Sequence, residues 1–192
     1  MKKLFIIAFA LISIINASAK KEKTDSLSVI KDETTLNIAF DFSKMTYGNK
    51  MAYQDFLISY TLNDPKSNII DWKSYWEGKA VPKLEQTFKS ALNGALSEGK
   101  CKIRINNDSV CVYKCLVTID KTDKNDGETY GKASIIDTKT KQVITTIEWD
   151  GKGGDNGEID ELMSYAMKDG GKQVGKDIAK RLRQKYEYSN RQ

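Results

Sequence analysis

The three cysteines could form a disulfide, and their spacing indicates a structural role more than a chemical one. A strand–turn–strand arrangement with its turn at residues 107–109 would place Cys101 opposite Cys115, at a separation that a disulfide can bridge. Cys111 and Cys115 cannot join within one straight strand, because four residues span about 13 Å. We therefore expect either a Cys101–Cys115 disulfide or three buried thiols that pack as small apolar residues.

The chain contains no histidine. This excludes Ser-His-Asp and Cys-His nucleophilic centres and His-ligated zinc, and it removes the side chain best suited to proton transfer near neutral pH. An enzyme built on this sequence would need paired carboxylates, Lys, Tyr or a bound cofactor. We recognise no such catalytic grouping, and we expect no catalytic residue, no resident metal and no cofactor.

Two loops partly match ligand-binding motifs. In the glycine-rich loop 150–157, Asn156 stands where a dinucleotide fingerprint needs its last glycine, and nearby acids would repel phosphate. Asp155 and Glu158 instead resemble a capping box at a helix start. The loop 123–127 misses the EF-hand register by one residue. We interpret both loops as structural, with an irregular calcium site in 123–127 as the alternative.

Aromatic residues gather in the first half of the chain, and two of them, Trp72 and Trp76, are four residues apart and would share one helical face. Core packing is the main interpretation, because aromatic side chains dominate core burial. The alternative is a ligand or partner surface formed by Trp72, Tyr75 and Trp76.

Residues 1–19 have the three parts of a cleavable signal peptide. Lys2 and Lys3 give a positive start, residues 4–15 are an apolar run, and the small residues 17–19 form an Ala-Ser-Ala cleavage site. The apolar run is shorter than the about 20 residues that a spanning helix needs, and no cysteine follows it as a lipid acceptor. We expect cleavage after Ala19, a periplasmic or secreted location through Gram-negative-type export, and no membrane span in the mature chain.

The overall charge is mild, at +5 for the whole chain, so it gives no reason to expect a nucleic-acid partner. Basic residues outnumber acidic ones from Lys172 onward, where only Asp177 and Glu187 oppose them. Such a tail is typical of a solvated helix face, and less often of a patch for acidic partners or anionic lipid headgroups.

The length suits one domain, and the hydrophobic pattern predicts its elements. We expect a flexible leader at 20–34, a single α+β domain at 35–187 and a tail at 188–192. The fold class we predict is α+β, with a single mostly antiparallel sheet of about five strands and two long helices packed on one face. The predicted strands are 35–42, 101–105, 111–119, 130–136 and 142–149, and the predicted helices are 49–60, 71–99 and 158–185.

Two small-residue features belong to the long helices. Gly99 is placed as the stop of the helix 71–99, after a new first turn at Pro82. In the last helix Gly171, Gly175 and Ala179 recur every four residues, and we interpret this stripe as letting the helix lie close to the sheet.

Three stretches carry a resemblance to a known family. They are VPKLEQTFKSALNGAL at 81–96, GKASIIDTKTKQVI at 131–144, and residues 151–182. They resemble small periplasmic domains of unknown function related to the curli secretion-channel lipoprotein and the TolB amino-terminal domain. The resemblance implies an α+β sandwich and envelope-associated protein contacts without catalysis. Lys141 stands where the family usually has glycine, and the pore-forming insertions of the curli channel are absent.

These observations lead to one main functional hypothesis and two alternatives. The main hypothesis is an exported, non-enzymatic domain that binds another envelope component, expected to be a protein. The first alternative is a carrier that holds a small ligand in the aromatic half. The second is a carboxylate-based glycan hydrolase, which needs two acids about 5–10 Å apart in one cleft. The oligomeric state is left open.

Overall fold

The computed structural model of the chain describes residues 26–63, 71–106 and 111–189. The predicted signal peptide 1–19, with its cleavage site at Ala19, lies outside the described residues, as does the first part of the predicted leader.

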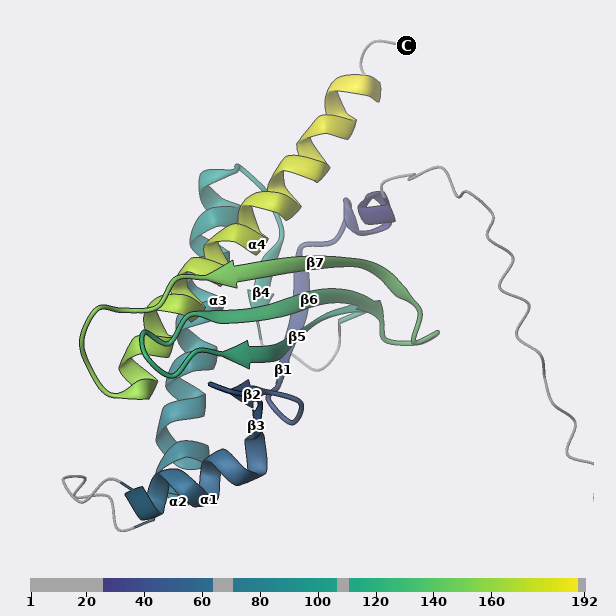
Figure 1. The fold of residues 1–192 in the computed structure, drawn as a ribbon. Coiled ribbons are helices and arrows are strands. Elements are labelled where there is room, and N and C mark those ends of the chain that lie inside the picture. The colour runs from purple at the N-terminus through teal and green to yellow at the C-terminus, as the bar shows by residue number, and fades with distance from the viewer. Residues whose placement is uncertain (1–25, 64–70, 107–110, 190–192) are drawn as a thin grey trace, which may run out of the picture.

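The described residues form one sheet whose one face is covered by two long helices (Figure 1). This confirms the α+β class, although the sheet has seven strands rather than about five and is mixed rather than mostly antiparallel. The strands are β1 (Thr35–Asp41), β2 (Thr46–Tyr47), β3 (Met51–Ala52), β4 (Arg104–Asn106), β5 (Tyr113–Thr122), β6 (Thr129–Asp137) and β7 (Val143–Gly151).

The strand β1 lies inside the sheet, between β4 and β5, and runs parallel to both. Leu36 pairs with Ile105 on one side, and Ile38 pairs with Cys115 on the other. The predicted hairpin between residues 101–105 and 111–119 is therefore wrong. The hairpin between β6 and β7, in contrast, is confirmed as an antiparallel pair.

The helices are η1 (Ser26–Ile30), α1 (Tyr53–Asn63), α2 (Trp72–Tyr75), η2 (Trp76–Ala80), α3 (Val81–Glu98) and α4 (Ile159–Ser189). The helix predicted at 71–99 is confirmed, because α2, η2 and α3 follow one another directly. Its start is capped by Asp71, whose side chain accepts from the backbone N–H of Ser74. The segment η2 is a π-helix in which the N–H of Val81 donates to the carbonyl of Trp76, so the helix widens immediately before Pro82.

Part of the predicted flexible leader is packed. Leu27 and Ile30 in η1 are fully buried, and η1 contacts α4 and β7, so the folded domain begins by residue 26 rather than at 35. Two apolar side chains in a short polar stretch are enough to anchor it on the core. At the other end α4 continues to Ser189, so the start of the predicted tail at 188–192 is helical.

The small-residue stripe of α4 faces α3 rather than the sheet, which corrects the sequence interpretation. A Cβ atom added to Gly171 would lie 2.4 Å from the Phe88 carbonyl oxygen, and one added to Gly175 would lie 2.6 Å from that of Leu92. A Cβ atom on Gly99 would lie 2.4 Å from the Cβ of Ala179. The two helices therefore pack backbone against backbone, which only glycine permits at these positions.

Gly99 ends α3 as predicted, but with an ordinary φ of −73°. The next residue, Lys100, takes the left-handed conformation with φ of 57°. The carbonyls of the last turn are closed by the N–H groups of residues 99–101. Glycine at position 99 is thus explained by its contact with α4 and not by its backbone angles.

None of the helices in the described ranges combines the length and the hydropathy needed to cross a bilayer.

Candidate functional site

The aromatic residues predicted as either core or ligand surface are packed on one another. Trp72 is 2% exposed and Trp76 is 0% exposed. The ring centroids of Trp76 lie 5.0 Å from Phe56 and 5.5 Å from Trp72. The Nε1 of Trp76 donates to the hydroxyl of Tyr53 at 3.0 Å. This burial favours core packing over a ligand surface at Trp72, Tyr75 and Trp76.

Tyr75 joins this aromatic core to the start of α4. Its hydroxyl donates to the Oδ2 of Asp160 at 3.0 Å, and the Nζ of Lys83 lies 4.0 Å from the same oxygen. Asp160 is only 4% exposed. Desolvation and the hydrogen bond to Asp160 raise the pKa of Tyr75 to about 12, so the tyrosine stays a donor. The nearby Glu158 accepts from Tyr60 at 3.3 Å, so both acids anchor α4.

The predicted Cys101–Cys115 disulfide is not present: all three cysteines are free thiols. The pairing on which it depended does not occur, because β1 separates β4 from β5. The alternative of three buried thiols holds only for Cys115, whose burial raises the pKa of its thiol to about 12. Cys101 and Cys111 are partly exposed.

The two loops with partial ligand motifs lie against each other. A Cβ atom on Gly153 would lie 1.7 Å from the carbonyl oxygen of Asp126, so glycine at 153 allows the two backbones to touch. In the loop 123–127 the side chains of Asp123 and Asp126 accept from the N–H groups of Asn125 and Glu128, each at 2.8 Å. These oxygens close turns of their own loop. Among the described residues no group of three or more metal-ligating side chains is found.

The strand β7 forms one edge of the sheet, and the backbone groups that face away from β6 are not paired with another strand in the described part of the chain. Within the described part of the chain β7 pairs only with β6, and Figure 1 shows it at one edge of the sheet with α4 crossing behind it. Its end is closed by side chains of α4. Gln173 donates to the Asp150 carbonyl and accepts from the Asp150 N–H at 3.4 Å, and Asp169 accepts from the Lys152 N–H at 3.3 Å.

These contacts fix the direction of the remaining backbone groups. In an antiparallel pair the N–H and C=O of successive residues point alternately toward and away from the neighbouring strand. Since those of Asp150 point away from β6, those of Glu148 and Thr146 do so too, because the register is regular from Gly151 to Thr145. We call the hollow beside them the β7 groove. It has a volume of about 490 Å³ and is lined by Thr146, Ile147, Glu148, Gln173, Asp177 and Arg181.

The α4 wall of the β7 groove is held in place by an ion pair. The Nη2 of Arg181 lies 2.7 Å from the Oδ2 of Asp177. The Nη1 of Arg181 donates to the Oγ1 of Thr145 at 3.3 Å. Sequence reasoning missed this site. The alternation in 142–149 identified a strand but carried no signal that the strand would lie at an edge.

No protein-family profile and no curated protein matches the chain. Among solved structures the chain is similar to PelC from Paraburkholderia phytofirmans, described as a dodecamer, with 10% identity and a TM-score of 0.34 over 74% of this chain and 86% of that one. It is also similar to protein XCC0632 from Xanthomonas campestris, of family DUF330, with 8% identity and a TM-score of 0.40 over 80% and 89% of the two chains. The resemblance to the curli and TolB proteins is not shown by these comparisons and stays a prediction.

Proposed function

We propose that this chain is an exported, non-enzymatic domain that binds an extended segment of another envelope protein at the β7 groove. The observation that carries the proposal is the outward-facing backbone of Thr146 and Glu148 on a nine-residue edge strand. An exposed strand edge is a template on which a further strand can pair.

The groove suits a strand better than a helix or a small molecule. Its donors and acceptors recur every second residue, about 6.8 Å apart, which is the spacing of a β-ladder. Because Gln173 and Asp169 already bind the backbone at Asp150 and Lys152, an added strand would pair from Glu148 toward the start of β7. There Val143 is 53% exposed and offers an apolar contact.

Thr146→Pro is expected to weaken binding of the partner segment about tenfold, because it removes one outward donor and puts a ring in the path of the added strand. Proline is tolerated on edge strands where its missing N–H faces solvent. The measurement is the yield of a photo-crosslink from position 148 in intact envelopes, with position 73 on α2 as background.

Thr146→Ala is the matched control. Like the proline variant, it removes the contact between the hydroxyls of Thr146 and Ser134 at 3.0 Å. Unlike the proline variant, it keeps the backbone N–H of residue 146. It should retain the crosslink. A yield that is equal in the proline and alanine variants, with both folded, would show that no strand pairs at β7.

The export part of the proposal depends on the signal peptide. We expect the protein isolated from its native cells to begin at Lys20, because the small residues 17–19 fit a signal peptidase. Intact mass measured on the periplasmic and secreted fractions checks this. A protein that retains Met1 and fractionates with the cytosol would contradict export, and with it an envelope partner.

A further inference from the structure

A second cavity lies on the other side of α4, at the end of α3. It has a volume of about 410 Å³, within the range of small-molecule sites. It is lined by the chain leaving η1, the segment that joins α3 to β4, and one turn of α4. We call it the basic pocket, and its lining residues are Lys31, Gly99, Lys100, Cys101, Lys102, Ile103, Ala179, Leu182 and Arg183.

The floor of the basic pocket is apolar. Ile103, Ala179 and Leu182, which are buried side chains of the core, line the cavity together with the partly exposed Cys101. None of the lining residues in the described part of the chain is aromatic, which disfavours nucleic-acid bases as ligands, since these stack on aromatic rings.

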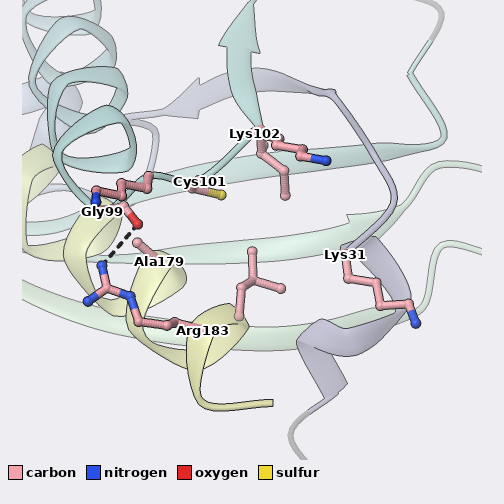
Figure 2. A pocket seen from close by; sticks show the side chains of 9 residues that line it. Lys31, Gly99, Cys101, Lys102, Ala179 and Arg183 are labelled. Atoms are coloured by element: carbon pink, nitrogen blue, oxygen red, sulfur yellow. Dashed lines mark hydrogen bonds between the residues drawn. The ribbon is translucent and has the colours of Figure 1, made fainter. Parts of the chain in front are cut away.

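The charged residues described at the rim are all basic. Lys31, Lys100, Lys102 and Arg183 line the cavity, and none of the lining residues that the structure describes is acidic. Within the described part of the chain none of the four forms an ion pair. Figure 2 shows Arg183 on the α3 side of the Cys101 sulfur, with Lys31 and Lys102 on the opposite side, and the Arg183 Nη2 donates to the Gly99 carbonyl at 3.0 Å.

One rim residue holds a backbone conformation that favours glycine. Lys100 has a φ of 57°, and the hydrogen bonds that end α3 keep it there. A lysine at this position costs stability relative to glycine but adds a basic residue to the lining of the cavity.

We infer that the basic pocket binds a free single-chain amphiphilic anion, such as a fatty acid, with its apolar chain on the floor and its carboxylate among the rim cations. A concave apolar floor buries a chain, and an unpaired cationic rim offsets the charge of the headgroup. The site is separate from the β7 groove, because Ala179, Leu182 and Arg183 lie on the opposite side of α4 from Asp177 and Arg181.

Cys101 provides a direct test, because its thiol lines the pocket while that of Cys111 does not. In the reduced protein, decanoate at ten times its Kd should slow alkylation of Cys101 by iodoacetamide about tenfold and leave Cys111 unaffected. Peptide mass spectrometry reads both sites in one sample. Decanol, which has the same chain without the charge, should protect Cys101 much less.

Two matched triple variants test whether binding of decanoate requires the rim cations. Changing Lys31, Lys100 and Lys102 to Gln should raise the Kd for decanoate about tenfold. The same change at Lys168, Lys176 and Lys180, exposed residues of α4 outside the pocket, should leave it unchanged. The inference is overturned if decanoate gives no protection, if decanol protects equally, if the two triple variants bind alike, or if only phosphatidylglycerol vesicles protect Cys101.

Discussion

Gly171→Val is expected to lower the free energy of unfolding by about 3 kcal/mol, which for a domain of this size means a fall of roughly 6–12 °C in Tm. The added Cβ atom would lie 2.4 Å from the Phe88 carbonyl oxygen and within 3.2 Å of its Cα. These are backbone atoms in the middle of α3, so no side chain can rotate to make room. The substitution must push α3 and α4 apart.

Gly94→Ala is the matched control for this prediction. Gly94 is also a helix glycine, but it is exposed and nothing lies within 4 Å of an added Cβ atom. Alanine there should raise the free energy of unfolding by about 0.5–1 kcal/mol, because it restricts the unfolded chain and favours the helix. Urea unfolding followed by circular dichroism measures both variants. If Gly171→Val is as stable as the parent, the two helices do not meet at Gly171.

The elements that the sequence predicted well are those defined by local signals. The hairpin of β6 and β7 is one of them, because apolar and polar residues alternate along its strands and the residues of its turn form hydrogen bonds with one another. The Oδ1 of Asp137 accepts from the N–H groups of Lys139 and Thr140, at 2.8 and 2.9 Å. Lys141 adopts the left-handed φ of 62°, a conformation that favours glycine, and its N–H donates to the Asp137 carbonyl at 2.9 Å. These local hydrogen bonds define the turn.

The order of the strands could not be predicted in the same way. Alternation shows which face of a strand is buried, but it does not show which strand lies beside it. The alternation of Leu36 and Ile38 with polar neighbours is compatible with a central strand and with an edge strand. The place of β1 between β4 and β5 is set by contacts between distant parts of the chain, and it is what separates Cys101 from Cys115.

The two candidate sites could not be predicted from the sequence for a related reason. The basic residues after Lys172 indicated a charged face, yet Arg183 alone among their described side chains lines the basic pocket. The other rim cations are Lys31, directly after η1, and two lysines of the segment after α3. A site assembled from three separated segments leaves no motif in any of them. The stripe of Gly171, Gly175 and Ala179 was visible, but its spacing could not identify α3 as its partner.

Trp76→Ala is expected to lower the free energy of unfolding by about 3–5 kcal/mol, the usual cost of removing a fully buried tryptophan. The side chain is 0% exposed and contacts Phe56 and Trp72. The cavity left behind would be lined by aromatic rings from α1 and α2, which cannot close it without moving both helices. Thermal unfolding followed by near-ultraviolet circular dichroism reports this packing directly.

Tyr53→Phe separates the hydrogen bond from the packing in the same place. It keeps the ring but leaves the buried Nε1 of Trp76 without the acceptor that it has at 3.0 Å, at a cost of about 1–3 kcal/mol. The smaller loss in this variant would assign most of the effect of Trp76→Ala to the packing of the indole. A Trp76→Ala protein as stable as the parent would instead favour the ligand-surface alternative, because side chains that wait for a ligand contribute little to the folded state in its absence. Because both indoles are buried, we expect the large loss of stability. That result would support an aromatic core that positions α4 through the hydrogen bond between Tyr75 and Asp160.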